Sequence, residues 1–136
     1  MDRMIFQAQL EMLDEMMEWI STHIEGMGFS SAESKKIQLA MEEALVNIIS
    51  YAYKDDKGTV ELICNAYPNE KITFTIMDKG ASFNPLLRSN KAPADVPLEE
   101  QEEGGLGIFF IRQLMDEVHY EHQHPYNVLT VIKILS

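Results

Sequence analysis

Two polar side chains, Glu43 and Asn47, stand among the apolar residues of the segment 36–53. At about 100° per residue, the apolar residues of this segment cover more than one side of a helix, whereas Glu43 and Asn47 lie one above the other on the same face. Asparagine is a poor residue for a helix interior, and a carboxylate is costly to remove from water. A binding partner therefore explains the pair better than helix propensity does.

Such a pair of oxygen-bearing groups has a specific chemistry at a phosphate. The amide oxygen of Asn47 can ligate a hard cation such as Mg²⁺, and the carboxylate of Glu43 can accept a proton from an attacking hydroxyl group or water. The alternative is structural, because a glutamate and an asparagine can also cap a neighbouring loop or face a water-filled seam. The two residues alone do not decide between these interpretations.

The length and composition limit the number of domains and the class of protein that the chain can form. With 136 residues, 46% hydrophobic and 24% charged, the chain fits a single soluble globular domain spanning residues 1–136. The single Cys64 excludes an internal disulfide, and neither a signal peptide nor a bilayer-spanning apolar run is visible, so we expect a cytoplasmic location.

The formal net charge of -11 disfavours nucleic acid or an anionic membrane as the main partner, because phosphates would be repelled. It suits a basic protein partner, or a nucleotide whose charge is offset by a metal. Solubility alone is an equally good explanation of this charge.

The amino-terminal third leads into the central segment. Residues 1–8 are either a short edge strand or a lead-in, and residues 9–24 have helical apolar spacing with acidic residues opposite, which predicts an amphipathic cover helix. Ser30, with Glu33 three positions later, forms a capping box. This box opens the central helix, which is predicted to end near Lys54.

Two antiparallel strand pairs are predicted after the central helix. Residues 59–66 and 71–77 are rich in β-formers and are joined by a hairpin signal, and residues 118–123 and 127–135 form a second such pair. Asp78-x-Gly80 follows the second strand and, taken alone, is explained by a turn.

A long segment separates the two strand pairs. Residues 86–103 show no periodicity, and loops of this length inside small domains are lids, binding loops or disordered segments.

A glycine-rich turn, Gly104-Gly105-Leu106-Gly107, then leads into a predicted helix. Free backbone N–H groups and the positive end of the helix dipole make such a turn an anion site. It is neither a Walker loop nor a dinucleotide fingerprint. Arg112, about one turn further on, either reaches a terminal phosphate or is a solvated helix residue.

Three histidines near the second strand pair invite a zinc interpretation. Strand alternation places His119 on the opposite face from His122 and His124, and no cysteine lies near them in the sequence. A zinc site is therefore disfavoured.

The order of these motifs carries a resemblance. Glu43-x-x-x-Asn47, then Asp78-x-Gly80 with Phe83, then the glycine-rich turn resemble the ATP-binding domain shared by gyrase, Hsp90-type chaperones, histidine kinases and MutL. More closely, the chain is similar to bacterial anti-sigma-factor serine kinases of the sigma-B regulator W type, from about Glu33 to its end. Three motifs in the same order are far more specific than any one of them.

The resemblance implies an α+β fold of the Bergerat type. This is a two-layer sandwich with a mixed, mainly antiparallel sheet, helices on one face, and ATP bound between the helices and a lid at about residues 86–107. Glu43 would be the general base, Asn47 would hold Mg²⁺ against the phosphates, Asp78 would accept the adenine amino group, and Gly80 would let adenine approach.

The same resemblance extends the nucleotide site to later residues. Gly105 and Gly107 would close the lid hinge over phosphate, and Thr130 would contact the adenine side through water. Ser82 replaces the second glycine of the wider superfamily's Asp-x-Gly-x-Gly, a departure common in the anti-sigma branch. The remaining residues expected at the nucleotide are Phe83, Gly104, Leu106 and Arg112.

The implied function is an ATP-dependent protein serine/threonine kinase of a partner-switching pathway. Its substrate would be a serine of a small anti-anti-sigma antagonist, its alternative partner a sigma factor, and its assembly a homodimer. The second hypothesis is a non-catalytic ATP-binding module that sequesters a regulatory partner. Histidine kinase activity is disfavoured because the early His23 has no second helix to pair with, and a MutL-like ATPase would need a longer chain.

Overall fold

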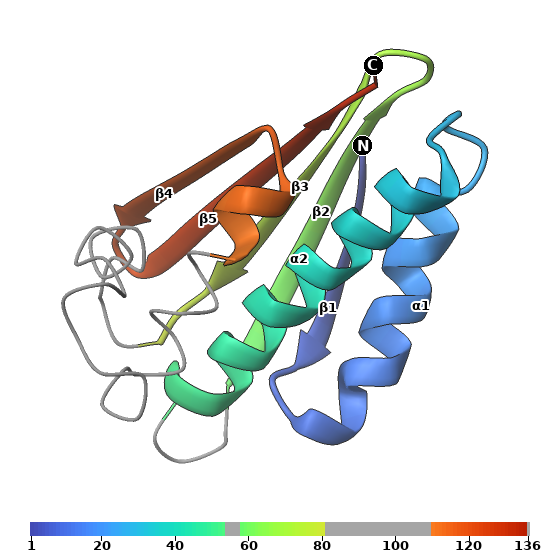
Figure 1. Cartoon of the computed structure of the whole chain (residues 1–136). Helices are drawn as coiled ribbons and strands as arrows, with labels where there is room; N and C mark the ends of the chain where they lie inside the picture. Colours follow the sequence, from blue (N-terminus) through green and yellow to red (C-terminus); the bar gives the residue numbers. More distant parts are fainter. Residues whose placement is uncertain (54–57, 81–109, 136) are drawn as a thin grey trace, which may run out of the picture.

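The computed structural model describes residues 1–53, 58–80 and 110–135. Within these ranges the strands form one five-stranded sheet in the order β1-β2-β3-β5-β4, and the helices lie on one of its faces (Figure 1). The strands are β1 Asp2–Gln7, β2 Thr59–Tyr67, β3 Lys71–Asp78, β4 Glu117–Gln123 and β5 Tyr126–Ile134, and the helices are the short 3₁₀ helix η1 Leu10–Met12, α1 Leu13–Ile24 and α2 Ser31–Tyr51. The predicted α+β two-layer sandwich is confirmed.

Strands β1 and β2 are neighbours in the sheet although they are far apart in the sequence. Both α1 and α2 lie between β1 and β2 in sequence, yet β1 and β2 are antiparallel neighbours, with Gln7 opposite Thr59. Of the two alternatives for residues 1–8, an edge strand or a lead-in, the structure therefore shows the edge strand. All four strand pairings in the described ranges are antiparallel, so these residues do not contain the mixed component that was expected.

Helix α2 begins at the predicted capping box. The Ser30 hydroxyl oxygen accepts a hydrogen bond from the Glu33 backbone N–H at 3.1 Å, and the hydroxyl donates to the Glu33 carboxylate at 3.3 Å. These bonds satisfy groups that the first helical turn leaves open. The helix ends at Tyr51, with Ala52 as its C-cap, before the predicted end near Lys54, which lies outside the described residues.

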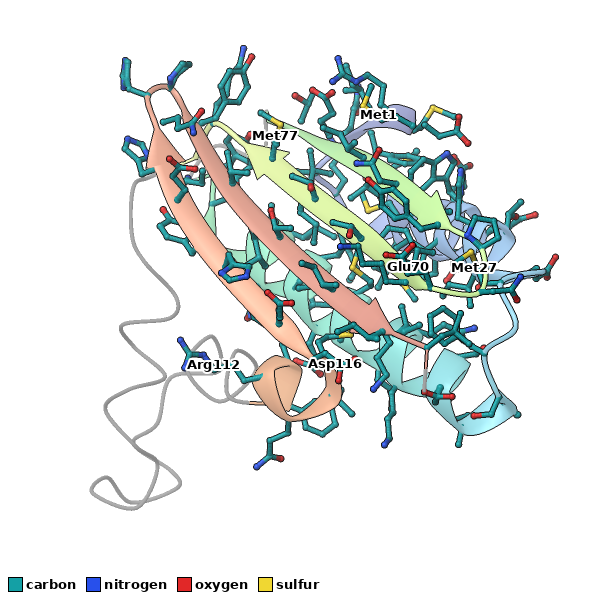
Figure 2. All side chains as sticks on the ribbon, turned by 90° about the horizontal axis from the view of Figure 1, so that it is seen from above. Met1, Met27, Glu70, Met77, Arg112 and Asp116 are labelled. Carbon is teal, nitrogen blue, oxygen red and sulfur yellow. The ribbon has the colours of Figure 1, made fainter. Side chains whose placement is uncertain are left out.

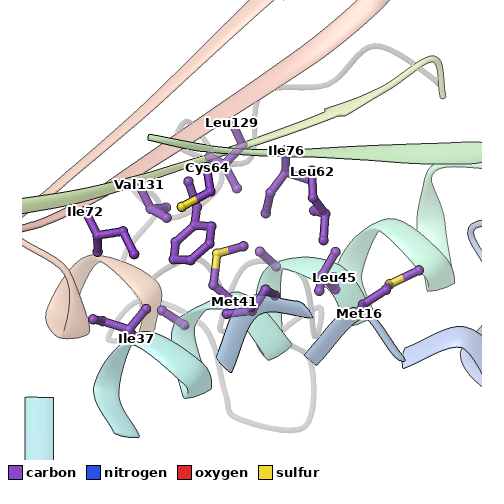
Figure 3. Packing of buried hydrophobic residues seen from close by; sticks show 14 of the residues in the cluster. Met16, Ile37, Met41, Leu45, Leu62, Cys64, Ile72, Ile76, Leu129 and Val131 are labelled. Atoms are coloured by element: carbon purple, nitrogen blue, oxygen red, sulfur yellow. The ribbon is translucent and has the colours of Figure 1, made fainter. Parts of the chain in front are cut away.

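The core lies between α1, α2 and the sheet (Figure 3). Strand β3 alternates strictly, so that Ile72, Phe74 and Ile76 face the helices and are fully buried. Met16 of α1 is also fully buried, which agrees with a filling role for the methionines of this helix. Each such side chain contributes about 1.5–3 kcal/mol by leaving water.

A short helix, residues 110–114, is attached to the end of β5. Lys133 is buried, and its Nζ donates to the Leu114 carbonyl at 3.4 Å and lies 3.8 Å from the Asp116 carboxylate. That carboxylate also accepts the Ile134 N–H at 2.7 Å. Figure 2 shows Asp116 where the helix meets β4. These contacts hold the segment that follows the glycine-rich turn against the sheet.

None of the helices in the three described ranges combines the length and the apolar composition needed to cross a bilayer.

Candidate functional site

The first part of the site lies on the second half of α2. Asn47 is buried, with 9% of its surface exposed, and its Nδ2 has no hydrogen-bond partner in the described part of the chain. Glu43 is one turn earlier on the same face and is half-buried. An unsatisfied buried amide costs about 1–3 kcal/mol. The Asn47 side chain therefore does not stabilise the fold through its Nδ2, and the role of its amide oxygen as a Mg²⁺ ligand stays a prediction.

The second part lies at the end of β3. Asp78 continues the buried face of that strand and is only 6% exposed. Its Oδ1 accepts the Gly80 N–H at 2.8 Å and the Asn127 Nδ2 at 3.0 Å. Both bonds fall on Oδ1, so among the described residues Oδ2 keeps its lone pairs for another donor.

Gly80 joins the two parts. A Cβ at this position would lie 2.3 Å from the Ala52 carbonyl oxygen and 2.6 Å from its Cβ, so only glycine fits against the end of α2. This packing gives a reason for Asp78-x-Gly80 besides room for adenine. Along the helix axis, Asn47 lies about 7.5 Å before Ala52, and Glu43 lies about 6 Å further back. Asp78 therefore lies near the end of the helix that carries the other two groups.

Tyr53, which the sequence analysis did not single out, connects the end of α2 to the two neighbouring strands. The Tyr53 hydroxyl donates to the Thr59 carbonyl at 2.6 Å and accepts the Lys79 N–H at 2.8 Å. It thereby links the end of α2 to the start of β2 and the end of β3, which lie on the same side of the molecule in Figure 1. Burial raises the pKa of Tyr53, since the ionised phenolate would lose its hydration.

Asn127 of β5 is a site residue that sequence reasoning missed. It lies directly opposite Asp78 in the β3–β5 register, is 5% exposed, and its Nδ2 donates to Asp78 and, at 3.2 Å, to the Gly80 carbonyl. No sequence motif marks it. The only signal is the register between two strands that are far apart in the chain.

Thr130, predicted on the adenine side, does not join this group. Along β5 the residues facing the helices alternate with those facing away, and Thr130 lies on the opposite face from Asn127 and Leu129. Its partner across the ladder is Thr75. Asn127 is the β5 residue that contacts Asp78, and the water-mediated role of Thr130 stays a prediction.

Comparison with known protein families identifies the family of the chain. The family model for the histidine kinase-like ATPase domain matches residues 6–133. The chain belongs to this family.

Within the histidine kinase-like ATPases, the relatives that match the chain include serine-protein kinases. Serine-protein kinase RsbW of Bacillus mycoides (strain KBAB4) is 34% identical over 106 residues, which cover 76% of this chain and 66% of the relative. Its counterpart in Bacillus cereus (strain AH820) is 35% identical with the same coverage. The chain thus spans about two thirds of the length of the curated relatives it matches.

A solved structure supports the fold of this ATPase domain. The SiaB-SiaC complex from Pseudomonas aeruginosa contains a chain that aligns with a TM-score of 0.64 at 14% identity, over 98% of this chain and 89% of that one. At this identity the likeness concerns the fold alone.

The residues present fit a magnesium ion that arrives with a nucleotide. The described ranges contain no cluster of three or more His, Cys, Asp or Glu side chains suited to a metal. A single buried amide, Asn47, agrees with Mg²⁺, which keeps several waters and takes few protein ligands when it binds with phosphates.

Several predicted site residues stay predictions. Arg112, labelled in Figure 2, lies on the short helix at residues 110–114 and is exposed, which leaves both interpretations of its role open. The predicted lid lies outside the described residues, as do Ser82, Phe83, Gly104, Gly105, Leu106 and Gly107.

Proposed function

We propose that this ATPase domain is an ATP-dependent protein serine/threonine kinase that acts as an anti-sigma factor in a partner-switching pathway. The observation that carries the proposal is that the second half of α2 bears the half-buried Glu43 and the buried Asn47, whose Nδ2 has no partner among the described residues, while Gly80 packs the buried Asp78 carboxylate of β3 near the end of the same helix. The similarity to relatives named serine-protein kinase RsbW supports phosphate transfer to a serine.

Each group would have one task in the transfer. Asp78 accepts the amino group of adenine, and Asn47 presents its amide oxygen toward the phosphates, where it would hold Mg²⁺. When bound, the ion offsets the charge of the phosphates. Glu43 accepts the proton of the acceptor serine as the serine oxygen bonds to the terminal phosphorus and the bond to ADP breaks. Positioning supplies most of the rate enhancement.

The partners follow from the same proposal. The acceptor serine belongs to a small anti-anti-sigma antagonist, and the alternative partner is a sigma factor. The chain acts as a homodimer in the cytoplasm. The glycine-rich turn, with Gly105 and Gly107, closes over the phosphates, and Arg112 reaches the terminal one.

Replacing the base tests the catalytic part of the proposal. Glu43→Gln keeps the size of the side chain but removes its proton-accepting carboxylate, so transfer from radiolabelled ATP to the antagonist should fall about 100- to 10,000-fold. Nucleotide affinity, measured by calorimetry, should be unchanged. Glu42→Gln is the matched control, because Glu42 is the exposed neighbour on the same helix. Transfer at the wild-type rate by Glu43→Gln would refute the assignment.

The same assay separates the kinase from a non-catalytic binding module. A module that only sequesters its partner would retain the partner in pull-downs with ATP but leave it unlabelled. Labelling of the antagonist by the wild-type chain, abolished by an alanine at its acceptor serine, supports the kinase.

A further inference from the structure

The Asn127 amide is bonded at both ends. Its Oδ1 accepts the Tyr120 hydroxyl at 2.6 Å and lies 3.0 Å from His122 Nδ1, while its Nδ2 donates to Asp78 and to the Gly80 carbonyl. If the amide were flipped, its oxygen would face a carboxylate and a carbonyl, which are both acceptors. Only one orientation therefore satisfies the network, and Nδ2 must point at Asp78.

This orientation limits what Asp78 can offer a ligand. Oδ1 already accepts two N–H donors, from Gly80 and from Asn127. A single oxygen, Oδ2, is left for a base. The carboxylate is thus prepared to accept one amino group.

Purine bases differ in the hydrogen-bond donors that they present to a carboxylate. Adenine presents one exocyclic amino group, which a single oxygen satisfies. Guanine presents a ring N–H beside its amino group, a pair that matches both oxygens of a carboxylate, and a carbonyl where adenine has its amino group. An aspartate with one oxygen already engaged therefore favours adenine.

We infer that Asn127, oriented by Tyr120 and His122 of β4, is a positioning residue that makes the Asp78 site selective for adenine over guanine nucleotides. This inference rests on the proposed function, because it takes ATP as the nucleotide at Asp78. Asn127 acts through Asp78 and Gly80. The β4–β5 hairpin thereby becomes the support of the base site.

Calorimetric titration of the full chain with ATP, ITP and GTP, each with Mg²⁺, tests this inference. The wild-type chain should prefer ATP. If none of the three nucleotides bound, the proposed function would be overturned together with the inference. Asn127→Leu removes the donor while keeping the volume. The ratio of ATP to GTP affinity should then fall about 10- to 100-fold, the effect of a lost hydrogen bond to a charged group.

Asn127→Asp gives a readout that a purely structural role would not produce. A second carboxylate facing Asp78 Oδ1 repels it, so ATP affinity should fall at neutral pH and recover as the pH is lowered, when one proton is shared between the two groups. Asn65→Asp is the matched control. It adds the same charge on β2, where Asn65 pairs with Thr73 and not with Asp78, and should change neither the affinity ratio nor its pH dependence.

A milder variant keeps the test decisive if the Asn127 variants fail to fold. Tyr120→Phe deletes one donor to Asn127 Oδ1, and the affinity ratio should fall about 3- to 10-fold, in line with one neutral hydrogen bond. Circular dichroism and thermal melting establish that each variant is folded. Folded variants that keep the wild-type ratio of ATP to GTP affinity would overturn the inference while leaving the kinase proposal intact.

Discussion

Two regions of the same helix–sheet interface are equally buried but differ in chemistry. Toward the start of α2 and β3, the interface is closed by apolar side chains such as Ile37, Ile72 and Phe74, each with no exposed surface. Toward the other end of the same two elements, it holds Asn47 and Asp78, both less than a tenth exposed. We call these the apolar region and the polar region.

The difference shows that burial alone does not reveal what a residue is for. Each large side chain of the apolar region stabilises the fold by about 1.5–3 kcal/mol. The polar region contributes little by comparison, because desolvation of its groups offsets their hydrogen bonds, and the Asn47 amide has none at Nδ2 among the described residues. Substitutions in the two regions should therefore change the free energy of unfolding by different amounts and even in different directions.

The largest effect is expected from Phe74→Ala in the apolar region. Phe74 is fully buried, so its truncation leaves a cavity and should lower the free energy of unfolding by about 3–5 kcal/mol. Equilibrium urea denaturation measures this loss. Thr75→Ala, on the outward face of the same strand, is the control, and a loss at Phe74 no larger than at Thr75 would contradict the assignment of the core.

Gly80→Ala should have the next largest effect. The new Cβ would overlap the Ala52 carbonyl oxygen, and relief of such overpacking costs about 1–3 kcal/mol. The end of β3 would move away from α2, so the affinity for ATP should fall as well. Denaturation and calorimetry on the same sample measure both quantities, and an unchanged unfolding midpoint would show that this contact is not tight.

The pH dependence of the free energy of unfolding should reveal the burial of Cys64 in the apolar region. Burial raises the pKa of its thiol from 9.0 to about 12, so the thiol ionises in the unfolded chain before it does in the folded one. This contribution to stability is fully present below about pH 9 and is lost as the pH rises toward 12. At pH 10 the wild-type chain should have lost on the order of 1 kcal/mol that Cys64→Ala does not lose.

Denaturation of both proteins over an alkaline pH series gives the difference. The comparison with Cys64→Ala removes the contribution of other groups that titrate in this range, including Tyr53. Parallel pH profiles for the two proteins would argue that the thiol is not protected from water.

The smallest change in stability, with the opposite sign, is expected for Asn47→Leu. Replacing an unsatisfied buried amide by an apolar side chain of similar size should raise the free energy of unfolding by up to about 1 kcal/mol. Binding of ATP in the presence of Mg²⁺ should nevertheless be lost, as calorimetry would show. If the variant were markedly less stable than the wild type, Asn47 would have a structural role that its contacts do not reveal.

Much of the fold could be predicted from the sequence because periodicity and turn chemistry are local. The capping box at Ser30 fixed the start of α2 correctly, and the β-formers after Gly58 gave two strands within about one residue of their observed bounds. The positions of Glu43 and Asn47 on one face of α2 follow from helical geometry alone.

The site at Asp78 was harder to predict because it depends on strand register. Which residue of β5 faces Asp78 is decided by the β3–β5 pairing, and a shift of one residue would exchange the two faces of the strand. Asn127 lacks any motif, whereas Thr130 is expected on the adenine side through a resemblance alone. Likewise, Tyr53 could not be linked to Lys79 before the ends of α2 and β3 were known to meet.

The placement of β1 has a consequence for how the chain assembles during synthesis. Its described pairing is with β2, where Asp2 lies opposite Cys64, so a nascent chain exposes β1 until both helices and the next strand have left the ribosome. The β2–β3 hairpin joins residues close in sequence and should form faster than this long-range pairing. We therefore expect closure of the β1 edge to be a late event in folding.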